Sequence, residues 1–328
     1  MRFSARRPET ASLIDLVSLS QASAAELCRA LQGTGLWLDV GAATLHVRSD
    51  SAAFAAQLRQ TYSAFPLLTA GPWADLHVRI ERARSPRRWL RPQVRMSCDG
   101  QQPFDPFPAS HPLPLFEWGC NWLLGQRLND LLLLHAGAVE RDGFALVLPA
   151  TPGSGKSTLT AALSQRGWRL LSDEFGAYDL STDCFRAMLK PVALKNQSID
   201  VIQRLAPHAR FGPAFEKTRK GTVAHLAATP DAVARRHEPA RPGAFVLPRW
   251  EAGAALRFKP LPDNRVFPAL AFNAFNYSVL GAASFNSVAG LAQRCMAWEL
   301  IYGDLDQALS AIDGIWPQVL ERGARDRR

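Results

Sequence analysis

The chain has 328 residues, 47% of them apolar, and a formal net charge of +9. This length and composition predict a soluble, globular protein with one or two sizeable cores. No transmembrane helix is expected, because no uninterrupted apolar run reaches the roughly 18 residues that a bilayer requires.

The N-terminal third predicts a small α+β domain without a catalytic motif. Pro8, Glu9 and Thr10 stand where a secretory signal would be apolar, so we expect a cytoplasmic protein. Alternating patterns predict strands over 36–47 and 76–81, with a helix over 51–65 between them. An arginine-rich segment then runs from Arg82 to Arg95. No nucleic-acid motif accompanies it, so we interpret it as a solvated surface and do not expect a nucleic-acid partner.

A proline-rich segment predicts the boundary between two domains. It contains Pro103, Pro106, Pro108, Pro112 and Pro114. Proline interrupts helices and central strands, so the segment is expected to be a linker between a domain of residues 1–112 and one of residues 113–328. After it, the pattern predicts a helix over 115–128 and two strands over 131–139 and 144–149. The Asp142-Gly143 pair between these strands is typical of a tight hairpin turn.

The second strand of this hairpin leads into a glycine-rich loop with the spacing of a phosphate-binding P-loop. The loop begins at Ala150, a small residue where the motif usually has glycine, and its binding residues are Gly153, Ser154, Gly155, Lys156, Ser157 and Thr158. The glycines allow close approach of the backbone to phosphate, and amides at the start of the following helix point at the anion. Lys156 is expected to reach the β- and γ-phosphates of ATP, and Ser157 to bind Mg²⁺.

Two carboxylates follow the next predicted strand, over 168–172. Asp173 and Glu174 stand only one short helix after Lys156, so they are candidates for a Mg²⁺ ligand and for the base that accepts a proton. The alternative is that they cap a helix or form a solvated turn. The five cysteines and seven histidines are dispersed, and no metal site made by protein ligands alone is expected. Any Mg²⁺ is expected to arrive with ATP.

These residues resemble the catalytic domain of HPr kinase/phosphorylase, and more closely the HPr-kinase-related proteins of bacterial peptide-modification gene clusters. The resemblance rests on residues 134–136, the loop 152–158 and residues 166–174, with weaker similarity at 194–196, 220–223 and 245–249. It implies an α/β P-loop kinase domain of the HPr kinase or phosphoenolpyruvate-carboxykinase type after a small α+β domain. It also implies that His135 lies beside the acidic pair, of which one member is the base. The family usually has two aspartates where this chain has Asp173 and Glu174, so the division of roles between them is open.

The sequence therefore predicts a kinase that uses ATP and Mg²⁺ to phosphorylate a serine or other hydroxyl. Its catalytic residues would be His135, Lys156, Asp173 and Glu174, and Ser157 and Asp173 would hold the metal. Two alternatives are a nucleotide hydrolase or switch, and a nucleotide-binding module that is not an enzyme. The acceptor, whether protein, peptide or small molecule, is not identified, and a homo-oligomer is one alternative for the assembly. The glycine-rich signature linked to the reverse, phosphorylase reaction is not found.

Overall fold

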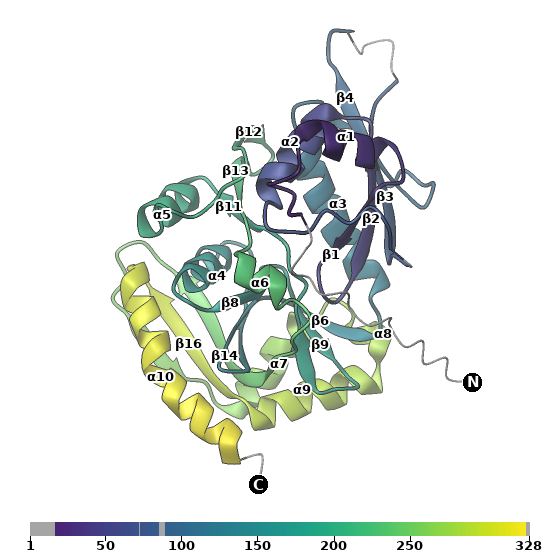
Figure 1. Cartoon of the computed structure of the whole chain (residues 1–328). Helices are drawn as coiled ribbons and strands as arrows, with labels where there is room; N and C mark the ends of the chain where they lie inside the picture. Colours follow the sequence, from purple (N-terminus) through teal and green to yellow (C-terminus); the bar gives the residue numbers. More distant parts are fainter. Residues whose placement is uncertain (1–16, 72, 85–88, 326–328) are drawn as a thin grey trace, which may run out of the picture.

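The computed structural model describes residues 17–71, 73–84 and 89–325, and within them the chain is a mixed α/β structure with three sheets. Figure 1 shows a smaller N-terminal unit above a larger body. Residues 1–16, on which the expected absence of a secretory signal depends, lie outside the described part, as do Arg87 and Arg88 of the arginine-rich segment. No helix in the described part is long and apolar enough to cross a membrane.

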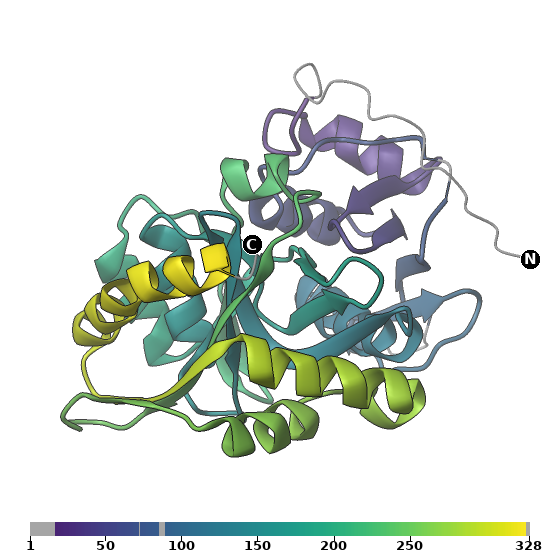
Figure 2. The same cartoon turned by 90° about the horizontal axis from the view of Figure 1, so that it is seen from below.

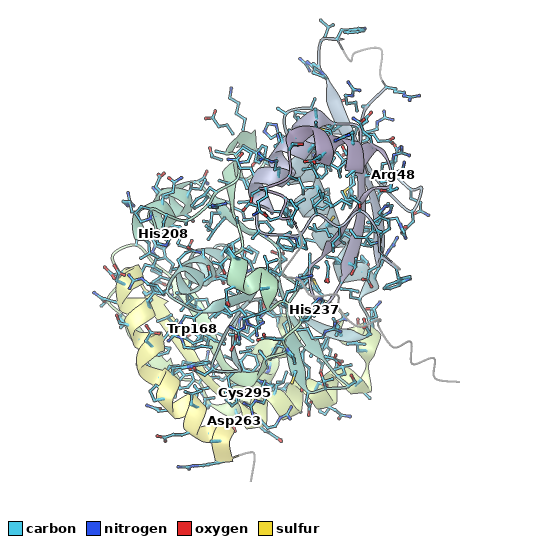
Figure 3. All side chains as sticks on the ribbon, in the orientation of Figure 1. Arg48, Trp168, His208, His237, Asp263 and Cys295 are labelled. Carbon is cyan, nitrogen blue, oxygen red and sulfur yellow. The ribbon has the colours of Figure 1, made fainter. Side chains whose placement is uncertain are left out.

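The N-terminal unit is built on a five-stranded sheet of order β1-β2-β3-β4-β5. Its strands are β1 (Leu36–Asp39), β2 (Thr44–Ser49), β3 (Leu76–Arg82), β4 (Gln93–Cys98) and β5 (Phe107–Pro108). Helices α1 (Ala24–Gln32) and α2 (Ala52–Thr61) pack on each other and on β2. The strands and helix predicted for this region are confirmed, and the first predicted strand divides into β1 and β2 around Gly41. Arg48 of β2 lies on the outer side of this unit (Figure 3).

Helix α3 (Pro112–Arg127) packs on the N-terminal sheet, although the sequence predicts that a second domain begins at residue 113. The segment before it is also more than a linker, because Phe107 and Pro108 form the edge strand β5. Proline is tolerated at a sheet edge and in the first turn of a helix, which accounts for both positions. The buried core continues from this unit into the larger body. Independent folding of residues 113–328 stays a prediction.

The larger body contains an eight-stranded sheet of order β10-β9-β6-β7-β14-β16-β15, with β8 paired to β6. The strands are β6 (Leu131–Arg141), β7 (Phe144–Pro149), β8 (Arg169–Ser172), β9 (Phe175–Asp179), β10 (Cys184–Arg186), β14 (Arg241–Trp250), β15 (Arg257–Pro260) and β16 (Met296–Tyr302). The predicted hairpin is confirmed, since β6 and β7 are joined by Asp142 and Gly143, both with positive φ. Strands β7, β14 and β16 are mutually parallel, so their carboxyl ends share one edge.

Helices and a small second sheet surround these strands. Helix α4 (Lys156–Gln165) packs on β6, β7 and β8, and α10 (Leu305–Arg325) packs on α4, β14 and β16. The small sheet consists of β11 (Val192–Lys195), β13 (Gly221–Leu226) and β12 (Phe215–Thr218), and two further helices are α5 (Gln197–Leu205) and α6 (Pro230–Ala234). Helices α7 (Asp263–Phe272), α8 (Tyr277–Leu280) and α9 (Ala282–Arg294) complete the body. Figure 2 shows α7 and α9 on the side away from the N-terminal unit.

Helix α4 approaches β6 closely because Gly137 has no side chain. A Cβ atom at Gly137 would lie 2.1 Å from Oγ1 of Thr160 on α4. That hydroxyl donates to the main-chain oxygen of Lys156, 2.9 Å away. Gly137 thus fixes how near the first turn of α4 lies to the strand that carries His135.

A buried ionic cluster joins the N-terminal unit to the larger body. Glu117 of α3 accepts a hydrogen bond from the Tyr62 hydroxyl at 2.5 Å and pairs with Lys190 at 3.0 Å. Lys190 also donates to Asn121 at 2.6 Å. Burial, followed by the nearby Glu117 carboxylate, raises the pKa of Tyr62 well above its usual range. The Glu117 carboxylate is therefore the shared partner of two buried polar groups, the Tyr62 hydroxyl and the Lys190 ammonium.

We expect Glu117→Ala to lower the free energy of unfolding by about 3–5 kcal/mol, because Lys190 and Tyr62 would be buried without their shared partner. Urea unfolding followed by circular dichroism measures this. The matched control is Glu81→Ala, which removes an exposed pair with Arg79 and should cost about 0–1 kcal/mol. Equal losses in the two variants would contradict the assigned role of Glu117.

Candidate functional site

The glycine-rich loop, residues 150–156, connects the carboxyl end of β7 to the first turn of α4. Gly153 and Gly155 have φ values of +91° and +85°, a region in which side chains are strained. Gly155 occupies the N-cap position of α4, and no side chain caps that end. Amide groups at this helix start are consequently available to an anion. The strand, loop and helix predicted from the sequence are confirmed in their order.

The ends of two neighbouring strands hold the loop in place. The Trp250 amide, at the end of β14, donates to the Ser154 oxygen at 2.9 Å. Tyr302, at the end of β16, donates from its hydroxyl to the Gly155 oxygen at 3.4 Å. A Cβ atom on Gly155 would lie 2.7 Å from the Tyr302 hydroxyl and 2.8 Å from Cβ of Trp250. Both the positive φ and this packing therefore demand glycine at position 155.

Lys156 and Asp173 meet in a buried site behind the loop. They are 7% and 8% exposed. The Lys156 ammonium donates to the main-chain oxygen of Asp173, and its Nζ lies 3.5 Å from Oδ1 of the same residue. Strand β8 brings Asp173 to this position from the end of the predicted strand over 168–172. The structure thus brings together two predicted residues that lie 17 positions apart in the sequence.

The Asp173 carboxyl is held in conditions that disfavour its charge. Burial is the largest influence and raises its pKa; the Glu174 carboxylate raises it further, whereas Lys156 and the Ser157 hydroxyl lower it. Oδ1 of Asp173 is buried and accepts no hydrogen bond, and the buried Ser154 hydroxyl is likewise without a partner in the described part of the chain. Buried polar atoms without partners are uncommon in proteins. They are available to a cation and to a phosphate oxygen, respectively.

These donors fit Mg²⁺ accompanied by a nucleotide. Mg²⁺ prefers one or two oxygen ligands from the protein together with phosphate oxygens and water. The Asp173 carboxylate and the Ser157 hydroxyl are groups of this kind, and their binding of Mg²⁺ stays a prediction. Within residues 17–71, 73–84 and 89–325, no cluster of three or more His, Cys, Asp or Glu side chains could hold a metal ion. A hydrated ion that shares its ligands with phosphate needs no such cluster.

Glu174 and His135 form the second half of the site. Glu174 follows Asp173, and its side chain is 41% exposed, with Oε1 3.7 Å from Nε2 of His135. His135 lies on β6, in register with Phe175 of β9. Burial is the largest influence on the histidine and lowers its pKa; Lys156 lowers it further, while Glu174 and Asp173 oppose the change. The predicted proximity of His135 to the acidic pair is found, with Glu174 as its neighbour.

A cavity of about 180 Å³ opens beside His135. Its other walls come from the loop and from the α7–α8 connection: Thr151, Pro152, Phe272, Asn273, Ala274 and Phe275. The connection is anchored to β6, since the His135 amide donates to the Asn273 oxygen at 2.6 Å and the Phe275 amide donates to the Leu133 oxygen at 2.9 Å. This wall was not predicted from the sequence. The available signal was that Phe272 and Phe275 lie in residues 266–293, a stretch without charged residues.

Lys195 is a further candidate residue of this site, and the sequence alone did not assign it a role. It ends β11, a strand that packs against α4. Partial burial is the largest influence on Lys195 and lowers its pKa; Lys220 lowers it further, whereas Asp173 and Glu174 oppose the change. The signal in the sequence was the confinement of all six lysines to positions beyond residue 155.

A larger cavity of about 530 Å³ lies at the opposite end of α4 and contains none of the predicted site residues. Trp168, labelled in Figure 3, is part of its lining. Several of its charged groups already have partners: Glu140 pairs with Arg169 at 2.5 Å, and Arg235 pairs with Asp231 at 3.4 Å. Residue chemistry, rather than size, therefore identifies the site beside the glycine-rich loop.

No family model matches the chain, and no curated protein matches its sequence. The likeness to HPr kinases accordingly rests on the motif residues.

The raised pKa of Asp173 predicts a pH-dependent response to Mg²⁺. A protonated carboxyl is a poor metal ligand, and Asp173 takes up its proton at a higher pH than an ordinary aspartate. The enhancement of ATP binding by Mg²⁺ should therefore decline as the pH falls through the raised pKa of Asp173, and this decline should begin at a higher pH than an ordinary aspartate, with a pKa of about 3.9, would cause. Calorimetric titration with a non-hydrolysable ATP analogue, with and without Mg²⁺, measures the enhancement.

Asp173→Asn is the matched control for that titration, because it keeps the shape of the side chain but cannot titrate. We expect a small enhancement by Mg²⁺ in this variant at every pH. An unchanged, pH-dependent enhancement in Asp173→Asn would show that another group is responsible.

Proposed function

We propose that this protein is an ATP-dependent phosphotransferase that moves the γ-phosphoryl group of ATP to a hydroxyl of an acceptor. The proposal includes a P-loop kinase domain of the HPr kinase or phosphoenolpyruvate-carboxykinase type. One observation carries it. Directly behind a glycine-rich loop, Lys156 and Asp173 share a buried site in which Oδ1 of Asp173 and the Ser154 hydroxyl have no hydrogen-bond partner among the described residues.

In this proposal the loop and its lysine bind the phosphates of ATP. Amides at the start of α4 and the Ser154 hydroxyl donate to phosphate oxygens, and the Lys156 ammonium stabilises the charge that develops on the transferred group. Lys156 would then exchange its hydrogen bond to the Asp173 main-chain oxygen for bonds to phosphate. Mg²⁺, held by Ser157 and Asp173, would neutralise phosphate charge.

Glu174 is the residue we assign as the base. Asp173 is buried and paired with Lys156, whereas Glu174 is partly exposed and lies beside His135, a residue that lines the cavity. The acceptor hydroxyl gives its proton to the Glu174 carboxylate while its oxygen forms a bond to the γ-phosphorus. The bond between that phosphorus and the bridging oxygen breaks, and ADP leaves with the electron pair. His135, with its lowered pKa, is neutral near pH 7 and orients Glu174 through Nε2.

A nucleotide hydrolase remains the second candidate, because a partly exposed Glu174 could equally activate water. The cavity beside His135 supports an acceptor, because Phe272, Ala274 and Phe275 give it apolar walls of the kind that line sites for organic ligands. A third alternative, a nucleotide-binding module that is not an enzyme, predicts bound ATP without turnover.

Incubation with γ-labelled ATP, Mg²⁺ and a lysate of the source cell separates these three functions. The proposed function predicts an acid-stable phosphoester on an acceptor molecule. Label that appears only as free phosphate would support the hydrolase, and label retained in ATP would support the binding module.

A further inference from the structure

Trp250 is an accessible tryptophan that adjoins the glycine-rich loop. It is the last residue of β14 and is 45% accessible. Its amide donates to the Ser154 oxygen at 2.9 Å, and its Cβ would lie 2.8 Å from a Cβ atom on Gly155. The main chain therefore holds Trp250 against the loop, while much of its large aromatic side chain stays available to a ligand.

The order of the large sheet places Trp250 and the acidic pair on opposite sides of the loop. The loop leaves the carboxyl end of β7, which lies between β6 and β14. Strand β8, which leads to Asp173, pairs with β6, and β6 carries His135. Trp250 ends β14, which runs parallel to β7 on its other side. Figure 1 shows β14 and β16 to the left of β6 and β9.

This arrangement indicates which part of ATP would meet Trp250. The phosphates of ATP form a chain, with the transferred γ-phosphate at one end and the nucleoside at the other. In the proposed function the γ-phosphate faces Asp173 and Glu174, on the β6 side of the loop. A nucleotide that crosses the loop amides therefore brings its nucleoside to the β14 side, where Trp250 lies.

The chemistry around Trp250 matches a nucleobase. Every base has a flat π face that stacks on an aromatic ring, and this contact tolerates any of the bases. The charged residues on either side of Trp250 are Arg249 and Glu251, which are bonded to each other at 2.5 Å. Their charges offset one another, so an uncharged ring is a better match for this position than a further phosphate.

We infer that Trp250 forms the nucleobase subsite of this chain, with its indole stacked on the base while the loop binds the phosphates. The inference rests on the proposed function and adds a binding residue to it. Because stacking does not read the edges of a base, the subsite should accept adenine and guanine alike. The rival explanation is that the Trp250 side chain only supports the conformation of the loop.

Calorimetric titration of the full chain tests the inference with three ligands in the presence of Mg²⁺: non-hydrolysable analogues of ATP and GTP, and inorganic triphosphate. Trp250→Ala should weaken the binding of both nucleotide analogues by about tenfold or more. Binding of triphosphate should stay unchanged, because alanine keeps the main-chain amide that donates to Ser154. Trp250→Phe keeps an aromatic ring and should recover most of the nucleotide affinity. The matched control is Trp122→Ala, which removes a 48% accessible tryptophan on α3 and should alter no affinity.

Three results would overturn the inference. Equal weakening of nucleotide and triphosphate binding in Trp250→Ala would show that the side chain supports the loop. Unchanged nucleotide binding in that variant would show that the base lies elsewhere, and failure of Trp250→Phe to recover any affinity would exclude stacking. Failure of the proposed function has a different signature: a wild-type protein that binds none of the three ligands, or one that binds ATP through Trp250 and transfers no phosphate.

Discussion

Lys156→Ala should reduce phosphoryl transfer by at least about 10²- to 10³-fold, equivalent to about 3–4 kcal/mol in the barrier. The reason is the position of the Lys156 ammonium, which is buried behind the glycine-rich loop and forms an ion pair with Asp173. Without the ammonium, only the loop amides and the metal ion would stabilise the negative charge on the transferred phosphoryl group. Steady-state transfer from γ-labelled ATP measures the loss in kcat.

The fold should survive this substitution, because the Asp173 carboxyl can take up a proton when its cationic partner is removed. Circular dichroism and thermal unfolding serve as the control. Lys156→Arg keeps the charge but changes its shape, so it should recover little activity in so closed a site. Near-normal turnover in a correctly folded Lys156→Ala protein would contradict the phosphotransferase assignment.

Substitution of either member of the acidic pair is the second change that should cause a large loss of activity. The two carboxylates have different proposed roles, so their losses should differ in kind. Glu174→Gln should lower acceptor phosphorylation by about 10²- to 10⁴-fold through loss of the base, with ATP and Mg²⁺ binding retained. Asp173→Asn should produce a loss at least as large, accompanied by a weakened response to Mg²⁺. Transfer rates measured over a range of Mg²⁺ concentrations distinguish the two substitutions.

The hydrolase alternative predicts another pattern for the same variants. Glu174→Gln would then stop hydrolysis in the absence of any acceptor and trap bound ATP. A variant pair in which Asp173→Asn alone abolishes transfer, while Glu174→Gln remains active, would assign the base to a residue other than Glu174. His135→Gln would then be the next variant to measure, because His135 is the neighbouring group at the cavity.

Features that depend on a few adjacent residues were predictable from the sequence. The Asp142-Gly143 turn requires positive φ at both positions, and the Gly153 to Thr158 spacing requires a strand before it and a helix after it; the structure has each of these. The capping box of α1, formed by Ser23 and Glu26, was also a local signal, but it was overlooked. Local backbone chemistry therefore accounts for the loop and its helix.

Features that depend on contacts between distant segments were not predictable in this way. The burial of Lys156 against Asp173 and the wall formed by Asn273 and Phe275 arise only when β8 and the α7–α8 connection are placed beside β6. Prolines around residue 112 suggested a break in the chain, whereas packing of α3 on the N-terminal sheet continues the core across it. The same proline pattern suits a linker, an edge strand or a helix start, and tertiary contacts decide among them.

The most direct test of the central claim is the partition of the γ-phosphoryl group between acceptor and water. Phosphorus NMR of one reaction, containing the purified protein, ATP, Mg²⁺ and the acceptor that γ-labelled ATP identifies, resolves the phosphorylated acceptor, free phosphate and ADP together. We predict phosphorylated acceptor that increases in step with ADP, with little free phosphate, and loss of both the phosphorylated acceptor and ADP in Glu174→Gln. Production of ADP and free phosphate in equal amounts, at a rate that the acceptor does not change, would contradict phosphoryl transfer to a hydroxyl acceptor.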